Sequence, residues 1–333
     1  MNTIKNTTSV ILAILFVITA MMAILFFNFD RRAFTAETYQ RAFAREDFYN
    51  KIPSLLAQSM ASGAGATQPP LGLQGLSQET WESFIRALLP PEVLKPIGDD
   101  VLNSTFAYLN MESDSIQVDL SPVKARMAGE AGAQAAVSLL NTLPGCTLDQ
   151  SAMIMFGMFS GDQIQLCNPP ASVLPMLMPL IQGQLKAASA IIPDKLTLVT
   201  APLQDDPRER LQTARLFMRL SLILPILFLL TLTILSVRTL KDWLKWWGHP
   251  FLATGVLTFI MGLLGAPIFG RLVSSLLSDR LPNYLPEFLS SFTSDFASAM
   301  VRALLVPIIW QGSALLLIGG ALTGFYYLSR KSA

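Results

Sequence analysis

Long apolar stretches alternate with polar regions along the chain. Four of these stretches contain no charged residue, and they cover residues 10–27, 220–237, 250–270 and 303–329. A helix that crosses the hydrocarbon core of a bilayer needs about 20 predominantly apolar residues. The pattern therefore predicts a mainly α polytopic membrane protein with four transmembrane helices.

The region between the first two stretches mixes polar and apolar residues, and it predicts a helical extracytoplasmic domain. The expected order is a cytoplasmic N-terminus, transmembrane helix 1, the outer domain, transmembrane helix 2, a cytoplasmic loop, transmembrane helix 3, an outer loop, transmembrane helix 4 and a cytoplasmic C-terminus. In that order, the bounds are residues 1–8, 9–28, 29–214, 215–237, 238–249, 250–271, 272–302, 303–329 and 330–333. Within the outer loop, phenylalanines at every fourth position from Phe288 to Phe296 predict an amphipathic helix.

The first apolar stretch could be a retained anchor or a cleaved signal peptide. A signal peptide has an apolar core of about 7–15 residues and small residues at its cleavage site. Here the apolar run is longer, and Asp30, Arg31 and Arg32 follow it. These features favour a retained anchor.

Basic residues in short loops predict the orientation of the spans. The loop at 238–249 carries three basic residues against one acidic residue, and the chain ends with Arg330 and Lys331. Short loops rich in Lys and Arg face the cytoplasm. We therefore expect a multi-pass protein of the cell membrane with both termini in the cytoplasm, although Arg215 and Arg219 then flank a span on the outer side.

Several local signals divide the outer domain into helices. Ser77 is a candidate N-cap for a helix that Pro90-Pro91 ends, and the next helix is expected to run to about Asn110. Ser121 is a candidate N-cap with Pro122 at the first helical position, and it opens a helix that ends at Pro144-Gly145. A further helix is expected at about 171–191.

Two short β-rich runs interrupt this helical pattern. Residues 116–120 and 195–200 are both bounded by turn residues, so they are candidates for a small two-stranded ribbon. After the second run, Asp206-Pro207 has the form of a strong helix start. Because no helix breaker follows before Pro225, we expect a continuous stalk that leads into the second span.

The outer domain contains both cysteines, Cys146 and Cys167. An even pair beside turn residues is typical of a disulfide in an oxidising compartment. The alternative is a pair of buried free thiols, which would fit the opposite orientation.

Composition narrows the choice of function. Hydrophobic residues make up 52% of the chain and charged residues 14%, against about 25% charged residues in soluble domains. This composition excludes intrinsic disorder. A net charge of +1 excludes a broad basic nucleic-acid-binding face.

The four spans explain most of the charge shortage, and the rest falls in residues 131–193. This segment is the expected core hairpin of the outer domain, an apolar binding surface for lipid or a partner, or a further span. Methionine is flexible and suits adaptable apolar surfaces. The candidate surface residues are Met153, Met155, Phe156, Met158, Phe159, Met176 and Met178.

No arrangement of residues predicts catalysis, a metal or a cofactor. The single His249 has no Cys or carboxylate partners nearby in the sequence and fits an interfacial aromatic belt with neighbouring tryptophans. The pairs Asp99-Asp100 and Asp205-Asp206 are expected to be solvated or to cap helices. A non-enzymatic protein without cofactors is therefore expected.

Small residues predict how the last two spans pack. Gly262, Ala266 and Gly270 recur at four-residue spacing in the third span, as do Gly320 and Gly324 in the fourth. Such spacing lets helix backbones approach closely. Gln311, in the fourth span, is expected to hold helices together by hydrogen bonding.

Three segments resemble a group of uncharacterised bacterial membrane proteins with the same order of spans and a large outer domain. They are IQVDLSP at 116–122, IIPDKLTL at 191–198 and LKWWGHPFLATGVL at 244–257. The layout is also similar to that of FtsX/MacB-type permease subunits, which work with a cytoplasmic ATPase. The resemblance to the first group implies a topology and no activity.

Together, these features lead to two expectations for function. The first is an envelope protein whose outer domain binds a protein partner or membrane lipid. The second is a membrane subunit of a permease or transport complex.

Overall fold

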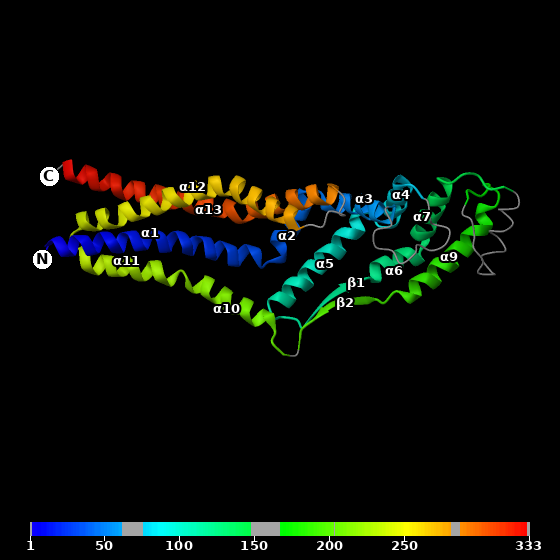
Figure 1. The fold of residues 1–333 in the computed structure, drawn as a ribbon, viewed down its shortest axis with the longest axis horizontal. Helices are drawn as coiled ribbons and strands as arrows, with labels where there is room; N and C mark the ends of the chain where they lie inside the picture. Colours follow the sequence, from blue (N-terminus) through cyan, green and yellow to red (C-terminus); the bar gives the residue numbers. More distant parts are fainter. Residues whose placement is uncertain (1, 62–75, 148–166, 203, 281–286, 332–333) are drawn as a thin grey trace. The chain divides into compact units, whose positions relative to one another are not determined.

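The computed structural model describes residues 2–61, 76–147, 167–202, 204–280 and 287–331 (Figure 1). The chain divides into two compact units. The first, here called the membrane bundle, comprises Met1–Ala42, Leu109–Met111 and Pro202–Ala333. The second, the helical domain, comprises Phe43–Tyr108 and Glu112–Ala201.

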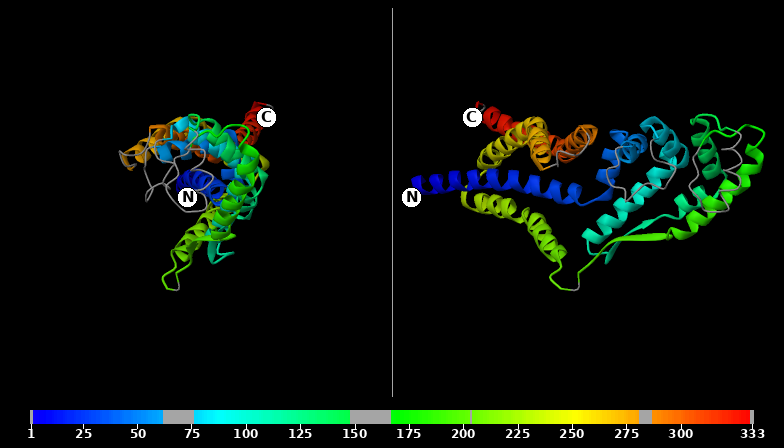
Figure 2. Two further views of the ribbon diagram at one scale, coloured as in Figure 1. Left: turned by 90° about the vertical axis from the view of Figure 1, so that its right-hand side faces the viewer. Right: turned by 45° about the vertical axis from the view of Figure 1, so that its right-hand side comes forward.

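The membrane bundle consists mainly of long apolar helices, as predicted. Four helical segments are long and apolar enough to cross a bilayer, which makes the chain a multi-pass membrane protein: Lys5–Ala33, Pro207–Ser236, Leu240–Gly265 and Ser298–Arg330. They belong to α1 (Asn2–Ala33), α10 (Pro207–Leu220) with α11 (Ile223–Ser236), α12 (Leu240–Arg280) and α13 (Glu287–Lys331). Helix α1 lies against α11, α12 and α13 (Figures 1 and 2).

Helix α12 begins well before the apolar stretch it contains. The Thr239 backbone N–H and hydroxyl both donate to Oδ2 of Asp242, and the Asp242 N–H donates to the Thr239 hydroxyl. This reciprocal capping box starts the helix at Leu240. Most of the predicted loop at 238–249 is therefore helical, and α13 likewise includes residues 287–302 of the predicted outer loop.

The predicted stalk before the second span is not one uninterrupted helix. Asp206 caps α10 as expected, because its side chain accepts a hydrogen bond from the Arg208 N–H. The helix then ends at Leu220, and α11 begins at Ile223. Pro225 lies four residues after Ser221 and has no N–H to donate to the Ser221 carbonyl, which accounts for the interruption.

Short helices make up most of the helical domain. Their bounds are α2 (Ala36–Arg45, shared with the membrane bundle), α3 (Phe48–Ala61), α4 (Gln78–Leu88), α5 (Pro91–Leu109), α6 (Ser121–Ala128), α7 (Glu130–Asn141) and α9 (Leu174–Ile191). Ser77 caps α4 as predicted. Trp81 and Ile85 of α4 are buried in a small core with Ala57 of α3.

The helix predicted from Ser121 to Pro144 is two helices. Gly129 is extended and separates α6 from α7. Ser121 is not the cap either: it is the first residue of α6, and its N–H donates to the Asp119 side chain. An aspartate two residues earlier competes successfully for this backbone group.

The two-stranded ribbon is confirmed. Strand β1 (Ser115–Asp119) pairs antiparallel with β2 (Lys195–Thr200), and the register shifts between Ile116 and Gln117. This shift leaves Leu198 as an extra residue on β2. Helix α5 lies beside the ribbon, where the Ser104 hydroxyl accepts a hydrogen bond from the Gln117 N–H (Figure 2).

Candidate functional site

The residues with the clearest functional potential fall in three places: a close helix seam and a charged cluster in the membrane bundle, and a disulfide-linked hairpin in the helical domain. The seam joins α12 and α13, which run antiparallel. A methyl group added at Gly319 would lie 2.2 Å from the Leu252 nitrogen, and one at Gly255 would lie 2.4 Å from the Leu316 nitrogen. The two backbones are therefore in direct contact.

These contacts recur every seven residues. Gly248, Gly255 and Gly262 face α13, while Gly312 and Gly319 face α12. A seven-residue repeat keeps one seam facing its partner along a pair of slowly coiling helices. Close packing of the third and fourth spans is thus observed, but with a different glycine pattern from the four-residue spacing in the sequence.

Only part of the predicted packing set lies on this seam. Gly262 does, because a methyl group there would lie 2.5 Å from a side-chain carbon of Ile309. Gly320 would gain only an ordinary contact at 4.0 Å, and Gly324 has open space around it. Ala266 and Gly270 lie within α12, and their surroundings are outside the described part of the structure.

Sequence reasoning missed the charged cluster, which forms around Asp30 at the end of α1. Its carboxylate accepts hydrogen bonds from Arg215 Nε at 2.7 Å and from Arg219 Nε at 2.8 Å. Arg215 also donates to the Asn110 side chain and stacks over the Phe34 ring. The side chains of Asp30 and Arg215 are 5% and 8% exposed, whereas Arg219 is 56% exposed.

This arrangement accounts for the two arginines beside the second span. Removing a charge from water costs free energy unless the charge is paired and hydrogen-bonded. Asp30 satisfies this requirement for the buried Arg215, and it also pairs with Arg219, whose side chain stays half exposed. Two residues before Asp30 along α1, the Asn28 amide donates to Gln311 Oε1 at 2.7 Å, so Gln311 does hold two helices together as predicted.

His249 lies at the other end of the membrane bundle. Its Nδ1 is 2.8 Å from the Lys245 carbonyl oxygen, and its ring meets the edges of Tyr326 and Tyr327. Together with Lys245 and Asn6 it lines one end of a cavity between α1 and α12. The position of His249 in an interfacial aromatic belt stays a prediction, and the cavity was not foreseen from the sequence.

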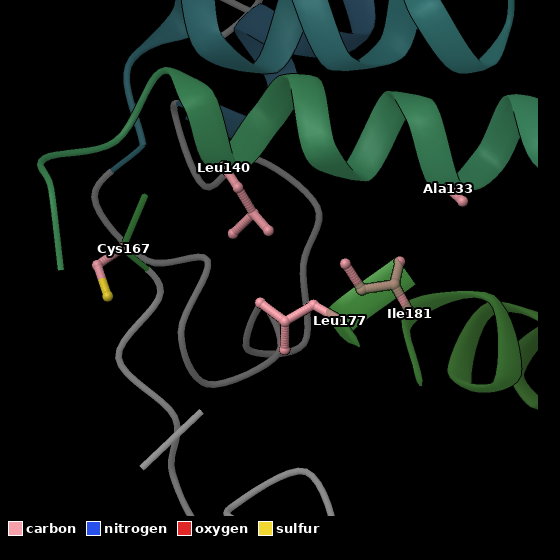
Figure 3. Packing of buried hydrophobic residues seen from close by; sticks show 5 residues of the cluster. All are labelled: Ala133, Leu140, Cys167, Leu177 and Ile181. Atoms are coloured by element: carbon pink, nitrogen blue, oxygen red, sulfur yellow. The ribbon is translucent and has the colours of Figure 1, made fainter. Parts of the chain in front are cut away.

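In the helical domain, the predicted disulfide is present. The Sγ atoms of Cys146 and Cys167 are 2.05 Å apart. Next to them, the Cys146 N–H donates to the Asn168 carbonyl, and the Asn168 N–H donates to the Pro144 carbonyl. The disulfide closes a hairpin of α7 and α9. Its buried residues lie together in Figure 3: Ala133, Leu140, Cys167, Leu177 and Ile181.

The candidate apolar surface is divided by the structure. Met178 packs against the hairpin core, which fits the core interpretation, whereas Met176 is 65% exposed. Met153, Met155, Phe156, Met158 and Phe159 lie outside the described residues. A second apolar surface is formed by strand β2, which is exposed along its whole length.

Two titratable groups of the helical domain have pKa values that their structural partners shift. The Tyr49 hydroxyl donates to Asp99 at 3.1 Å, and burial together with the Asp99 charge raises the pKa of Tyr49 well above its usual range. The hydrogen bond from Ser121 lowers the pKa of Asp119. Among the described residues, no group of three or more His, Cys, Asp and Glu side chains is placed to hold a metal ion.

Comparison with known proteins finds no matching family model, no matching curated protein and no matching solved structure. The geometry above is therefore the basis for any functional conclusion.

Proposed function

We propose that this chain is a non-enzymatic protein of the cell envelope whose helical domain lies outside the cytoplasm and binds a protein partner along strand β2. The exposed, unpartnered side of β2 carries the proposal. The sheet has two strands, so within the described part of the chain no strand lies on the other edge of β2. The β1 edge, by contrast, meets α5 through Ser104.

The chemistry of this edge favours a protein over a lipid. An unpaired strand edge presents backbone N–H and C=O groups that an extended peptide segment satisfies by adding a strand. Lipid chains have no such groups. The apolar side chains of β2 would contribute burial, since Leu196, Leu198 and Val199 are 42%, 51% and 43% exposed.

Two features support this compartment. The basic residues of segment 238–249, most of which forms the start of α12, and the basic C-terminus favour a cytoplasmic location for both. A disulfide persists in an oxidising compartment and is rare in the cytoplasm, and it supports the placement of Cys146 and Cys167 outside.

A site-specific photocrosslinker at Leu198 in native membranes tests the proposal. We expect a discrete crosslinked protein at Leu198 and none at exposed Ser83 on α4. Leu198→Lys should abolish co-purification of that protein because a charge on an edge strand opposes strand addition; Ser83→Lys should leave it unchanged. Crosslinks to lipid alone, or equal capture in both variants, would reject the proposal, and an ATPase as the main co-purified protein would favour the permease subunit instead.

A further inference from the structure

The cavity between α1 and α12 has a polar end and an apolar remainder. Its volume is about 560 Å³. Asn6, Lys245 and His249 line one end, and the walls beyond them are aliphatic, including Val10, Ile14 and Leu257. The two helices run in the same direction (Figure 1), so Asn6 and Lys245 lie at one end of the cavity and Ile18 and Leu257 lie further along their helices.

The length of the cavity corresponds to one leaflet of a membrane. On α1 the lining runs from Asn6 to Ile18, and on α12 from Lys245 to Leu257. At a rise of 1.5 Å per residue, each wall is about 18 Å long. Half of a hydrocarbon core that is about 30 Å thick measures about 15 Å. An extended acyl chain therefore fits between the helices with its head at the polar end.

The residues at the polar end indicate the charge of the lipid head group that would bind there. Lys245 provides a cation, and its ammonium lies 5.3 Å from the centre of the Trp246 ring. Asn6 provides a neutral amide that can donate hydrogen bonds, and no carboxylate is among the described residues that line the cavity. A phospholipid head group with a net negative charge complements this set of residues better than a zwitterionic head group does. Trp246 is a residue type enriched at the level of head groups.

From this geometry we propose that the groove between α1 and α12 is a binding site for an anionic phospholipid, with one acyl chain between the helices and the phosphate at Lys245. The site is independent of strand β2 and of the orientation of the chain. It lies in the leaflet that holds the N-terminal end of α1, whichever side of the membrane that is.

Native mass spectrometry of the full-length protein, exchanged into mixed micelles with either phosphatidylglycerol or phosphatidylcholine, tests the charge of the site. We expect the wild type to retain phosphatidylglycerol about fivefold more strongly, which is the contribution of one lysine near an anionic surface. Lys245→Gln should remove this preference. Lys241→Gln makes the same charge change at an exposed position of α12 outside the cavity, and it should keep the preference.

A second pair of variants tests the groove itself. Ala253→Leu fills space within the lining, so it should reduce the number of retained lipids for both head groups. Ala321→Leu adds the same volume on α13 away from the cavity and should leave retention unchanged. Equal retention in Ala253→Leu and wild type, an unchanged preference in Lys245→Gln, or a groove filled by a second copy of the chain would each overturn the proposal.

Discussion

The interactions that stabilise the membrane bundle internally differ from those that stabilise the helical domain. In the bundle, glycines bring the backbones of α12 and α13 into contact, and a buried carboxylate joins α1 to α10. In the helical domain, the buried clusters are small, and a disulfide connects the residues that follow α7 to those that precede α9. Burying apolar side chains drives folding in water. In a bilayer, however, an apolar side chain is no better off against another helix than against lipid tails. The bundle therefore relies on close backbone packing and a buried ion pair, and the helical domain relies on small apolar cores and a disulfide.

The largest expected difference concerns ion pairs. Asp30→Ala would leave Arg215 buried without its carboxylate, and removing one partner of a buried pair costs about 3–5 kcal/mol. In the helical domain, Lys124 pairs with Asp194, whose side chain is 72% exposed. Asp194→Ala should cost less than about 1 kcal/mol. The free energy of unfolding of both variants, measured in the same detergent, tests this difference. Equal losses of stability would show that the Asp30 cluster is not effectively buried.

The disulfide should stabilise only the helical domain. It closes a loop with a sequence separation of 21 residues, for which the chain-entropy model gives about 3 kcal/mol. Replacing both Cys146 and Cys167 by serine should lower the free energy of unfolding of that domain by this amount. The thermal transition of the bundle should not move. A reductant added to the wild type should reproduce the effect, and no change on reduction would contradict it.

The glycine seam should tolerate a methyl group at one position and reject it at another. Gly319→Ala places the methyl against the α12 backbone, so we expect a loss of about 1–3 kcal/mol, as for other overpacked sites. Gly324 has open space around it, and Gly324→Ala should be neutral or slightly stabilising because alanine favours helix. Thermal stability of the purified protein compares the two. Equal destabilisation would mean that helix α13 presents a different face to α12.

The smallest effect is a pH dependence confined to the helical domain. Because the pKa of Tyr49 is raised in the folded state, the protonated hydroxyl stabilises the fold below the unfolded pKa, which is about 10. This contribution is lost as the pH rises through the folded value. Unfolding measured between pH 8 and pH 11 should show declining stability above about pH 10, and Tyr49→Phe should flatten that decline. The same slope in both proteins would exclude Tyr49 as the source.

Part of this architecture could be predicted from local sequence signals. Long stretches without charged residues predicted the spans, and two β-rich runs predicted the pairing of β1 with β2. The single pair of cysteines predicted the disulfide. Each of these features depends on residue types that carry their own structural preference. The start of α10 at Asp206-Pro207 was predictable for the same reason.

The contacts inside the bundle could not be predicted in the same way. Every face of a membrane-spanning helix is apolar, so hydropathy does not indicate which face packs against a neighbour. The sequence contains Gly319 and Gly320 in succession, and only the structure shows that Gly319 meets α12. The seven-residue spacing of glycines from Gly248 to Gly262 was the signal that could have located the seam. The Asp30 pairs join residues more than 180 positions apart, which no local pattern encodes.

We propose that the membrane bundle holds a disulfide-linked helical domain outside the cytoplasm. Labelling of Cys146 and Cys167 in intact cells with a membrane-impermeant maleimide, before and after a mild reductant, tests it most directly. We expect no labelling before reduction and labelling after it, first at the less buried Cys146, without permeabilising the cells. Labelling that requires permeabilised cells, or that occurs without reductant, would contradict it.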